Sequence, residues 1–91
     1  MPMIIVTAQV QDPEKWEAGF RTHGDLFRTY NLHAPVRYAI AGNEVAVCME
    51  PKNLDTLKQA IKSQATAEAM AFDGVKLETL KTFILDKEMK L

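Results

Sequence analysis

Residues 13–32 read PEKWEAGFRTHGDLFRTYNL, and this stretch decides how the rest of the chain is arranged. Its four aromatic residues and its one histidine recur at steps of four, three, four and three: Trp16, Phe20, His23, Phe27 and Tyr30. This spacing places the five side chains on one face of an α-helix. We therefore predict a single amphipathic helix from Pro13 to about Leu32, with an imidazole in the middle of an aromatic stripe.

Signals at both ends support this helix. Asp12 is a good N-terminal cap, followed by a proline at the first helical position, and Asn31 suits a left-handed residue at the C-terminal end. Inside the helix, Gly19 and Gly24 each cost about 1 kcal/mol relative to alanine. Gly19 lies one turn before His23, so we predict that it leaves room beside the imidazole.

Strand-like segments flank this helix. Alternating or continuous apolar residues predict strands over residues 3–10, 36–41, 44–50 and 76–86. Gly42-Asn43 predicts a tight hairpin between the second and third strands, with glycine at the position that needs a positive φ. Asn53 begins a second helix whose pattern weakens at Ser63 and resumes in a short helix that ends at Asp73-Gly74.

The resulting order is β-α-β-β-α-β, which predicts one α+β domain over residues 1–91, with a ferredoxin-like four-stranded antiparallel sheet. Right-handed crossovers place the helices on one face of the sheet. The other face would expose a set of small apolar residues: Ile5, Ala39, Ala41, Ala46 and Cys48. A second copy packed face to face would cover them, so we predict a homodimer formed through this sheet face.

Composition excludes several classes of function. Eleven basic and twelve acidic residues are scattered, so a nucleic-acid partner is not expected. Cys48 is the only cysteine and cannot form an internal disulfide, and two histidines in this pattern do not predict a metal site. No segment has the length of a membrane helix, and the start of the chain does not read as a signal peptide, which predicts a cytoplasmic protein.

Two motifs add a resemblance: Trp16-x3-Phe20-x2-His23-x3-Phe27, and Glu68-Ala69-Met70-x3-Gly74-Val75. With the element order and length, they resemble the dimeric α+β barrel superfamily, and above all its small uncharacterised members. That superfamily includes cofactor-free monooxygenases acting on polyketide-like phenols, haem-degrading enzymes, polyketide cyclases, lactone isomerases and dye-decolourising relatives.

The resemblance implies a ligand held between the helices and the concave sheet. The sequence departs from the branches whose members carry a tryptophan early in the second half and a histidine in the second helix. Residues 51–75 contain neither. The resemblance therefore does not extend to a haem site, and we predict no bound cofactor.

His23 is the candidate catalytic residue. Among aromatic side chains an imidazole is partly desolvated, which disfavours its cationic form. It would then act as a general base at neutral pH, removing a proton from a phenol or an activated C–H group. The alternative is a histidine at the edge of the core, hydrogen-bonded to a strand side chain or to water.

The candidate ligand-binding residues are Trp16, Gly19, Phe20, Phe27, Tyr30, Arg37 and Tyr38. We expect the aromatic residues to belong to the hydrophobic core, together with Met70 and Phe72. The same side chains would also form the wall of an apolar ligand site. The Tyr30 and Tyr38 hydroxyls would contact a polar ligand atom, or else be satisfied within the protein. Arg37 would clamp a carboxylate near the dimer seam, or else be solvated.

Two functions of different kinds follow. The first is a cofactor-free enzyme of the cyclase, isomerase or monooxygenase type, acting on an aromatic or polyketide-like ligand with His23 as base. The alternative is a homodimer that binds or senses the same kind of ligand without catalysis. A structural dimer module without a pocket is the third reading, and an enclosed space touching His23 would argue against it.

Overall fold

Four antiparallel strands form one sheet in the order β2-β3-β1-β4 in the computed structural model, which describes residues 3–33 and 35–91. The strands are β1 Met3–Val10, β2 Arg37–Ala41, β3 Glu44–Met49 and β4 Val75–Leu85. Their ends lie within one residue of those predicted. Val6 pairs with Val47 of β3 on one side and Thr82 of β4 on the other, so β1 occupies the centre of the sheet.

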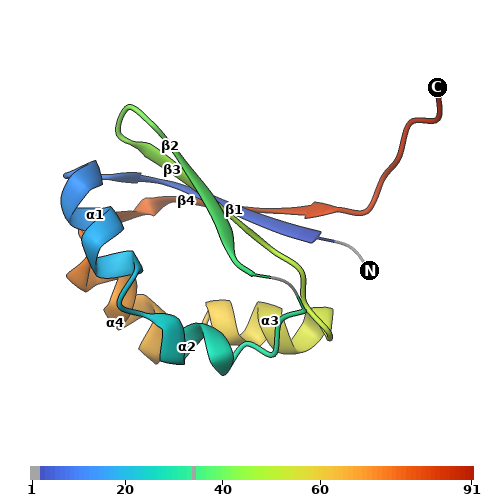
Figure 1. The fold of residues 1–91 in the computed structure, drawn as a ribbon, viewed down its shortest axis with the longest axis horizontal. Coiled ribbons are helices and arrows are strands. Elements are labelled where there is room, and N and C mark those ends of the chain that lie inside the picture. Colours follow the sequence, from blue (N-terminus) through green and yellow to red (C-terminus); the bar gives the residue numbers. More distant parts are fainter. Residues whose placement is uncertain (1–2, 34) are drawn as a thin grey trace.

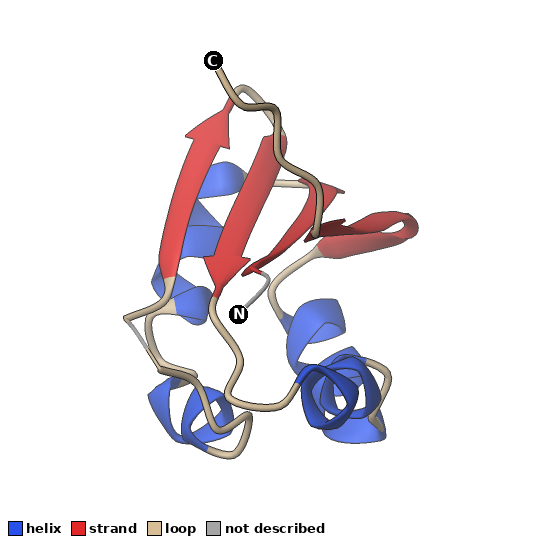
Figure 2. Ribbon diagram, turned by 90° about the vertical axis from the view of Figure 1, so that its right-hand side faces the viewer, coloured by secondary structure: helices blue, strands red, loops and turns tan. Residues whose placement is uncertain are grey.

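The helices all lie on one side of this sheet, beneath it in Figure 1, and leave its other face without a helix (Figure 2). They are α1 Pro13–Phe20, α2 Gly24–Arg28, α3 Leu54–Ile61 and α4 Gln64–Phe72. The prediction of one helix from Pro13 to Leu32 is wrong, because the chain leaves helical geometry between Phe20 and Gly24. The ferredoxin-like α+β fold is confirmed, with the order β-α-α-β-β-α-α-β.

Local signals place several ends where the sequence predicts them. The Asp12 carboxylate accepts hydrogen bonds from the N–H groups of residues 14 and 15, and the Asn53 side chain accepts one from Thr56. Asn31 has a φ of 57° and Gly42 a φ of 61°, both in the left-handed region that helix ends and hairpin turns require.

The core lies between the helices and the inner face of the sheet. It combines strand residues with residues in or directly after the helices: Ile4, Val10, Val45, Val47, Met49, Trp16, Tyr30 and Leu57 are buried. Phe72 was predicted to belong to it and does not, since 75% of its surface is exposed. The reason is helical geometry: α4 turns Thr66, Ala69 and Met70 toward the core side, which leaves Phe72 on the opposite side.

The outer face of the sheet carries the apolar residues predicted for it. Ile5 lies opposite Cys48 on one neighbouring strand and Phe83 on the other, and Ala39 lies opposite Ala46. Phe83 and Leu85 are 48% and 51% exposed. This row is therefore an apolar surface without a helix over it.

Candidate functional site

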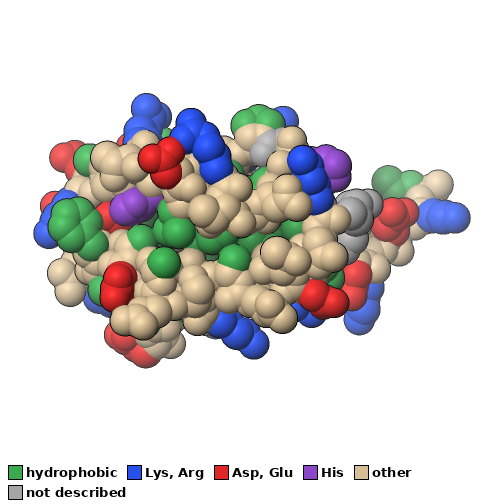
Figure 3. Space-filling view, turned by 90° about the horizontal axis from the view of Figure 1, so that it is seen from below, with side chains coloured by type: hydrophobic (Ala, Val, Ile, Leu, Met, Phe, Trp, Pro, Cys, Tyr) green, Lys and Arg blue, Asp and Glu red, His purple; other side chains and the backbone are tan. Residues whose placement is uncertain are grey.

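A cavity of about 90 Å³ lies between the helices and the inner face of the sheet. Seen from the helix side, apolar side chains gather along a groove between two ridges of the surface (Figure 3). The volume is below the range of about 300–1,000 Å³ that is common for small-molecule sites. The cavity by itself therefore suits a small ring, and a larger ligand would extend into the groove.

The break between α1 and α2 shapes one end of this cavity. The N–H groups of Thr22 and His23 donate to the carbonyls of Gly19 and Phe20, at 3.0 and 3.1 Å, which tightens the turn after α1. α2 then begins at Gly24. Despite the break, the five residues of the predicted stripe all line the cavity: Trp16, Phe20, His23, Phe27 and Tyr30.

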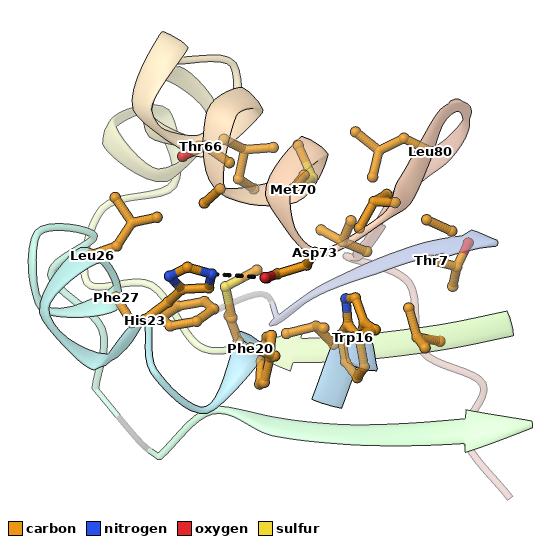
Figure 4. Close-up of a pocket in the computed structure, with 18 of the residues that line it drawn as sticks. Thr7, Trp16, Phe20, His23, Leu26, Phe27, Thr66, Met70, Asp73 and Leu80 are labelled. Carbon is orange, nitrogen blue, oxygen red and sulfur yellow. Dashed lines mark hydrogen bonds and ion pairs between the residues drawn. The ribbon is translucent and has the colours of Figure 1, made fainter. Parts of the chain in front are cut away.

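His23 pairs with a carboxylate that is distant in sequence. Its Nε2 lies 2.8 Å from Oδ2 of Asp73, and the two side chains are 21% and 4% exposed (Figure 4). With the proton on Nε2, the lone pair of the neutral ring lies on Nδ1, which has no hydrogen-bond partner among the described residues. The arrangement thus orients an imidazole in the cavity wall with one nitrogen able to accept a proton.

Gly19 makes room for Asp73 rather than for His23. A Cβ atom built on Gly19 would lie 2.0 Å from Asp73 Oδ1 and 2.8 Å from its Cγ. Any side chain at this position would displace the carboxylate. Gly19 itself does not line the cavity, so its predicted place beside a ligand is corrected to a packing contact with Asp73.

Asp73 is the site residue that the sequence reasoning missed, since it was read only as part of a helix stop. It follows α4 directly, at the C-cap. A negative charge there opposes the helix dipole, which favours cations at that end. A carboxylate at this unfavourable position is a signal in the sequence. It predicts a cationic or hydrogen-bonding partner from elsewhere in the chain.

The aromatic residues form a continuous wall. Trp16 stacks on Phe20 with ring centroids 4.7 Å apart, Phe20 meets Phe27 edge-on at 5.1 Å, and Phe27 meets Tyr30 at 5.3 Å. Pairs of this kind contribute about 0.5–1.5 kcal/mol beyond their buried area. The wall is therefore rigid packing as well as a surface for an apolar ligand.

The Tyr30 hydroxyl is used within the protein. It lies 2.5 Å from Oγ1 of Thr66 in α4, and Thr66 Oγ1 donates to the Ala60 carbonyl at 2.7 Å. Burial raises the pKa of the Tyr30 phenol above its ordinary value of about 10, and the hydrogen bond with Thr66 opposes this shift. Tyr30 thus stays neutral and ties the end of the α1–α2 segment to α4.

The Tyr38 hydroxyl also has partners outside the cavity. It donates to Glu17 Oε2 at 2.5 Å and accepts from Arg21 Nε at 2.8 Å. The hydrogen bond that Arg21 donates to the Tyr38 hydroxyl raises the pKa of the Arg21 guanidinium. Tyr38 packs its ring on Phe20, with centroids 4.9 Å apart, and so supports the aromatic wall from behind.

Arg37 is exposed, and it lies opposite Cys48 in the row of the outer sheet face. It is thus separated from the cavity by the sheet. The structure brings Asp73 together with the five residues of the predicted stripe at the cavity, and leaves Gly19, Arg37 and Tyr38 outside its lining.

In the described ranges 3–33 and 35–91, no three His, Cys, Asp or Glu side chains come together as ligands for a metal ion. In the same residues, no helix combines the length and apolar character needed to cross a membrane.

Comparisons by sequence identify no relatives: no protein-family model and no curated protein matches the chain. Comparisons by structure find several. SnoaB, a cofactor-independent oxygenase from Streptomyces nogalater, superposes with a TM-score of 0.71 at 10% identity, over 99% of this chain and 95% of that chain.

A protein from Bordetella bronchiseptica, provisionally named an antibiotic biosynthesis monooxygenase, has a TM-score of 0.70 at 17% identity, over 98% of this chain and all (100%) of that one. A provisionally named antibiotic biosynthesis monooxygenase from Deinococcus radiodurans gives 0.65 at 10% identity, over 100% of this chain and 96% of that chain. Identities this low establish the fold alone. The resemblance to the dimeric α+β barrel superfamily is confirmed as a likeness of fold.

Proposed function

We propose that this protein is a small-molecule enzyme that binds an aromatic or polyketide-like ligand in the cavity under the sheet, with His23 as general base. One observation carries the proposal: the 2.8 Å hydrogen bond between His23 Nε2 and the buried Asp73 carboxylate, at the wall of an otherwise largely apolar cavity. A carboxylate that holds one ring nitrogen leaves the other to accept a proton from a phenol or an activated C–H group. Cyclisation, isomerisation and cofactor-free oxygenation each begin with such a step.

The structural neighbours support an enzyme of this kind without specifying it. SnoaB is described as a cofactor-independent oxygenase, so a chain of this fold carries out oxygenation without a bound cofactor. We accordingly propose that His23 and Asp73 do their chemistry without a cofactor.

The alternative is a homodimer that binds or senses a ligand in the same cavity without turnover. The occupied tyrosine hydroxyls favour it: Tyr30 is bonded to Thr66 and Tyr38 to Glu17. Neither hydroxyl is therefore available to stabilise an oxyanion in the ligand.

Under both functions, we propose that the protein forms a homodimer through the outer face of its sheet. Phe83 and Leu85, about half exposed, lie in the apolar face that no helix covers, beside Ile5 and Cys48. Arg37 lies at the edge of that face, where we propose that it meets the second copy. Light scattering at micromolar concentration tests this: a mass near twice 10.2 kDa is expected, and a mass of one chain would contradict it.

The test of catalysis uses 1,2-benzisoxazole as a proton-transfer probe. A base removes its C3 proton, the N–O bond breaks, and 2-cyanophenolate is released, which is followed by its absorbance. We expect saturable acceleration by the wild type and a loss of about tenfold or more in His23→Ala.

His33→Ala is the matched control, because this exposed histidine is not among the residues that line the cavity. It should behave as the wild type. Equal rates in the wild type and His23→Ala would exclude the base. If the probe still binds, that result selects the non-catalytic alternative.

A further inference from the structure

We propose that a second pocket, at the surface of the protein, binds a small organic carboxylate: a ring or short apolar chain that carries one carboxylate group. This surface pocket has a volume of about 350 Å³ and lies where the chain leaves α2 and where it enters α3 (Figure 1). Its volume falls in the range of about 300–1,000 Å³ that is common for small-molecule sites. Six of the residues that line it are Phe27, Arg28, Leu32, Pro35, Val36 and Lys52.

Backbone hydrogen bonds fix the rim of the surface pocket. Asn31, with its φ of 57°, turns the chain out of α2. Its carbonyl accepts a hydrogen bond from the Lys52 N–H at 3.1 Å, and the His33 N–H donates to the Glu50 carbonyl at 2.8 Å. These bonds hold the segment after α2 against the segment before α3. The side chains that the two segments contribute therefore stand on a defined backbone.

The body of the surface pocket is apolar. Phe27, Leu32, Pro35 and Val36 all contribute to its lining. Phe27 also lines the cavity under the sheet, so this residue is shared by the walls of the two spaces. Burying apolar ligand surface against such side chains contributes about 25 cal/mol per Å². The lining therefore favours an anion with an apolar body over a bare inorganic anion.

The two charged residues of the lining, Arg28 and Lys52, are both cations. No carboxylate is found among the described residues that line the pocket. Lys52 belongs to no ion pair between described residues, whereas Arg28 pairs with Asp25 in the same helix. That pair is largely exposed, and exposed pairs contribute at most about 1 kcal/mol. A ligand carboxylate can therefore compete with Asp25 for the guanidinium, whose fork of donors suits a carboxylate.

Gly24 keeps one side of the surface pocket free of a side chain. It begins α2 and lines the pocket. Its backbone does not require glycine, since its φ is not positive, and a Cβ built on it meets no heavy atom within 4 Å. A glycine loses more conformational entropy on folding than any other residue. Packing gives no reason for this cost, whereas access of a ligand to the pocket does.

The test is an NMR titration of the full-length protein with three probes. Phenylacetate carries a ring and a carboxylate, 2-phenylethanol carries the ring alone, and acetate carries the carboxylate alone. We expect phenylacetate to bind about fivefold tighter than either, because each exposed cation contributes up to about 1 kcal/mol. Sodium chloride at about 1 M should remove most of its advantage over 2-phenylethanol, since salt screens exposed charges.

Methyl signals locate the bound probe. Leu32 and Val36 line only the surface pocket, and Val47 and Met70 line only the cavity under the sheet. We expect phenylacetate to shift the signals of Leu32 and Val36. Shifts confined to Val47 and Met70 would place the probe in the cavity under the sheet and overturn the second site.

Variants test the two cations and the glycine. Lys52→Gln should weaken phenylacetate binding about threefold. Lys58→Gln is the matched control, an exposed lysine of α3 outside the lining. Asp25→Asn should tighten binding about threefold, because it frees Arg28 from its competitor. Gly24→Leu should weaken phenylacetate and 2-phenylethanol alike, since its side chain occupies the open space beside the pocket.

The remaining outcomes decide the proposal. Equal affinities for phenylacetate and 2-phenylethanol would overturn the role of the cations, and equal affinities for phenylacetate and acetate would overturn the apolar body. Wild-type affinity in Lys52→Gln, or weaker binding in Asp25→Asn, would also overturn it. None of these results depends on the function proposed for His23, so the two proposals fail independently.

Discussion

The two helical connections of this protein are both broken, but by different means. Between α3 and α4 the break is local: Ser63 accepts a hydrogen bond from the Thr66 N–H and donates one to the Ala60 carbonyl at 2.7 Å. Between α1 and α2, His23 precedes α2 without a capping hydrogen bond from its side chain. Its ring instead binds Asp73, which is 50 residues away in sequence.

The difference shows which interruptions between helices are encoded by neighbouring residues. A serine ahead of a short helix is an N-cap signal that acts within three residues. At the α1–α2 break, His23 precedes a helix without capping it, and Asp73 places a negative charge at the end of another helix, where the dipole disfavours it. The hydrogen bond between the two side chains forms only when the fold brings them together.

The largest effect is expected for His23→Ala. It leaves the buried Asp73 carboxylate without its partner, and breaking a buried pair of this kind costs about 3 kcal/mol. Urea unfolding measures the loss, and the double variant His23→Ala/Asp73→Asn should recover part of it. Wild-type stability in the single variant would mean that the break does not depend on the pair.

Gly19→Ala comes next, at about 2 kcal/mol, because its Cβ would overlap Asp73. Gly24→Ala is the matched control: no heavy atom lies within 4 Å of a Cβ there, and a compatible glycine-to-alanine change stabilises by about 0.4–1 kcal/mol. Opposite signs for the two glycines in the same unfolding assay are expected. Equal effects would refute the contact between Gly19 and Asp73.

Tyr30→Phe should cost about 1.5 kcal/mol, because it removes the hydrogen bond that joins the α1–α2 segment to Thr66 in α4. Its pH dependence is a second signature. Since the pKa of Tyr30 is raised on folding, the unfolded state loses the proton first, and wild-type stability should fall as the pH rises above about 10.

Urea midpoints between pH 9 and pH 11 measure this slope. The slope should be shallower in Tyr30→Phe than in the wild type. An unchanged slope would show that Tyr30 is not the group responsible.

Ser63→Ala should have the smallest effect, about 1 kcal/mol, the usual cost of losing an N-cap. Because this break is local, the imidazole signals of His23 should stay where they are in the NMR spectrum of the variant. A shift of those signals would show that the two breaks are coupled and would weaken the contrast drawn between them.

Much of the fold was predictable because its signals are short-range. Alternation over residues 3–10, the turn at Gly42 and the caps at Asp12 and Asn53 each act within a few residues, and the structure has them where they were expected. The shared face of the aromatic stripe was also predictable, since its five residues all line the cavity: Trp16, Phe20, His23, Phe27 and Tyr30.

The candidate site was predictable only in part. His23 and its aromatic neighbours were identified, but the hydroxyl of Tyr38 turned out to join Glu17 and Arg21 outside the cavity. The prediction that Gly19 leaves room for His23 was also wrong, because the space beside Gly19 is occupied by the Asp73 carboxylate. Helical periodicity gives the direction of a side chain and does not give its partner.

The sequence by itself determined the order of the elements, the sheet and the face on which the aromatic residues lie, because periodicity and capping are properties of near neighbours in the chain. Only the tertiary structure decided that the first helix breaks before Gly24 and that an imidazole meets a buried carboxylate there. The physical reason is that the negative charge of Asp73 at the end of α4, which the helix dipole disfavours, is offset by a hydrogen bond to an imidazole half the chain away.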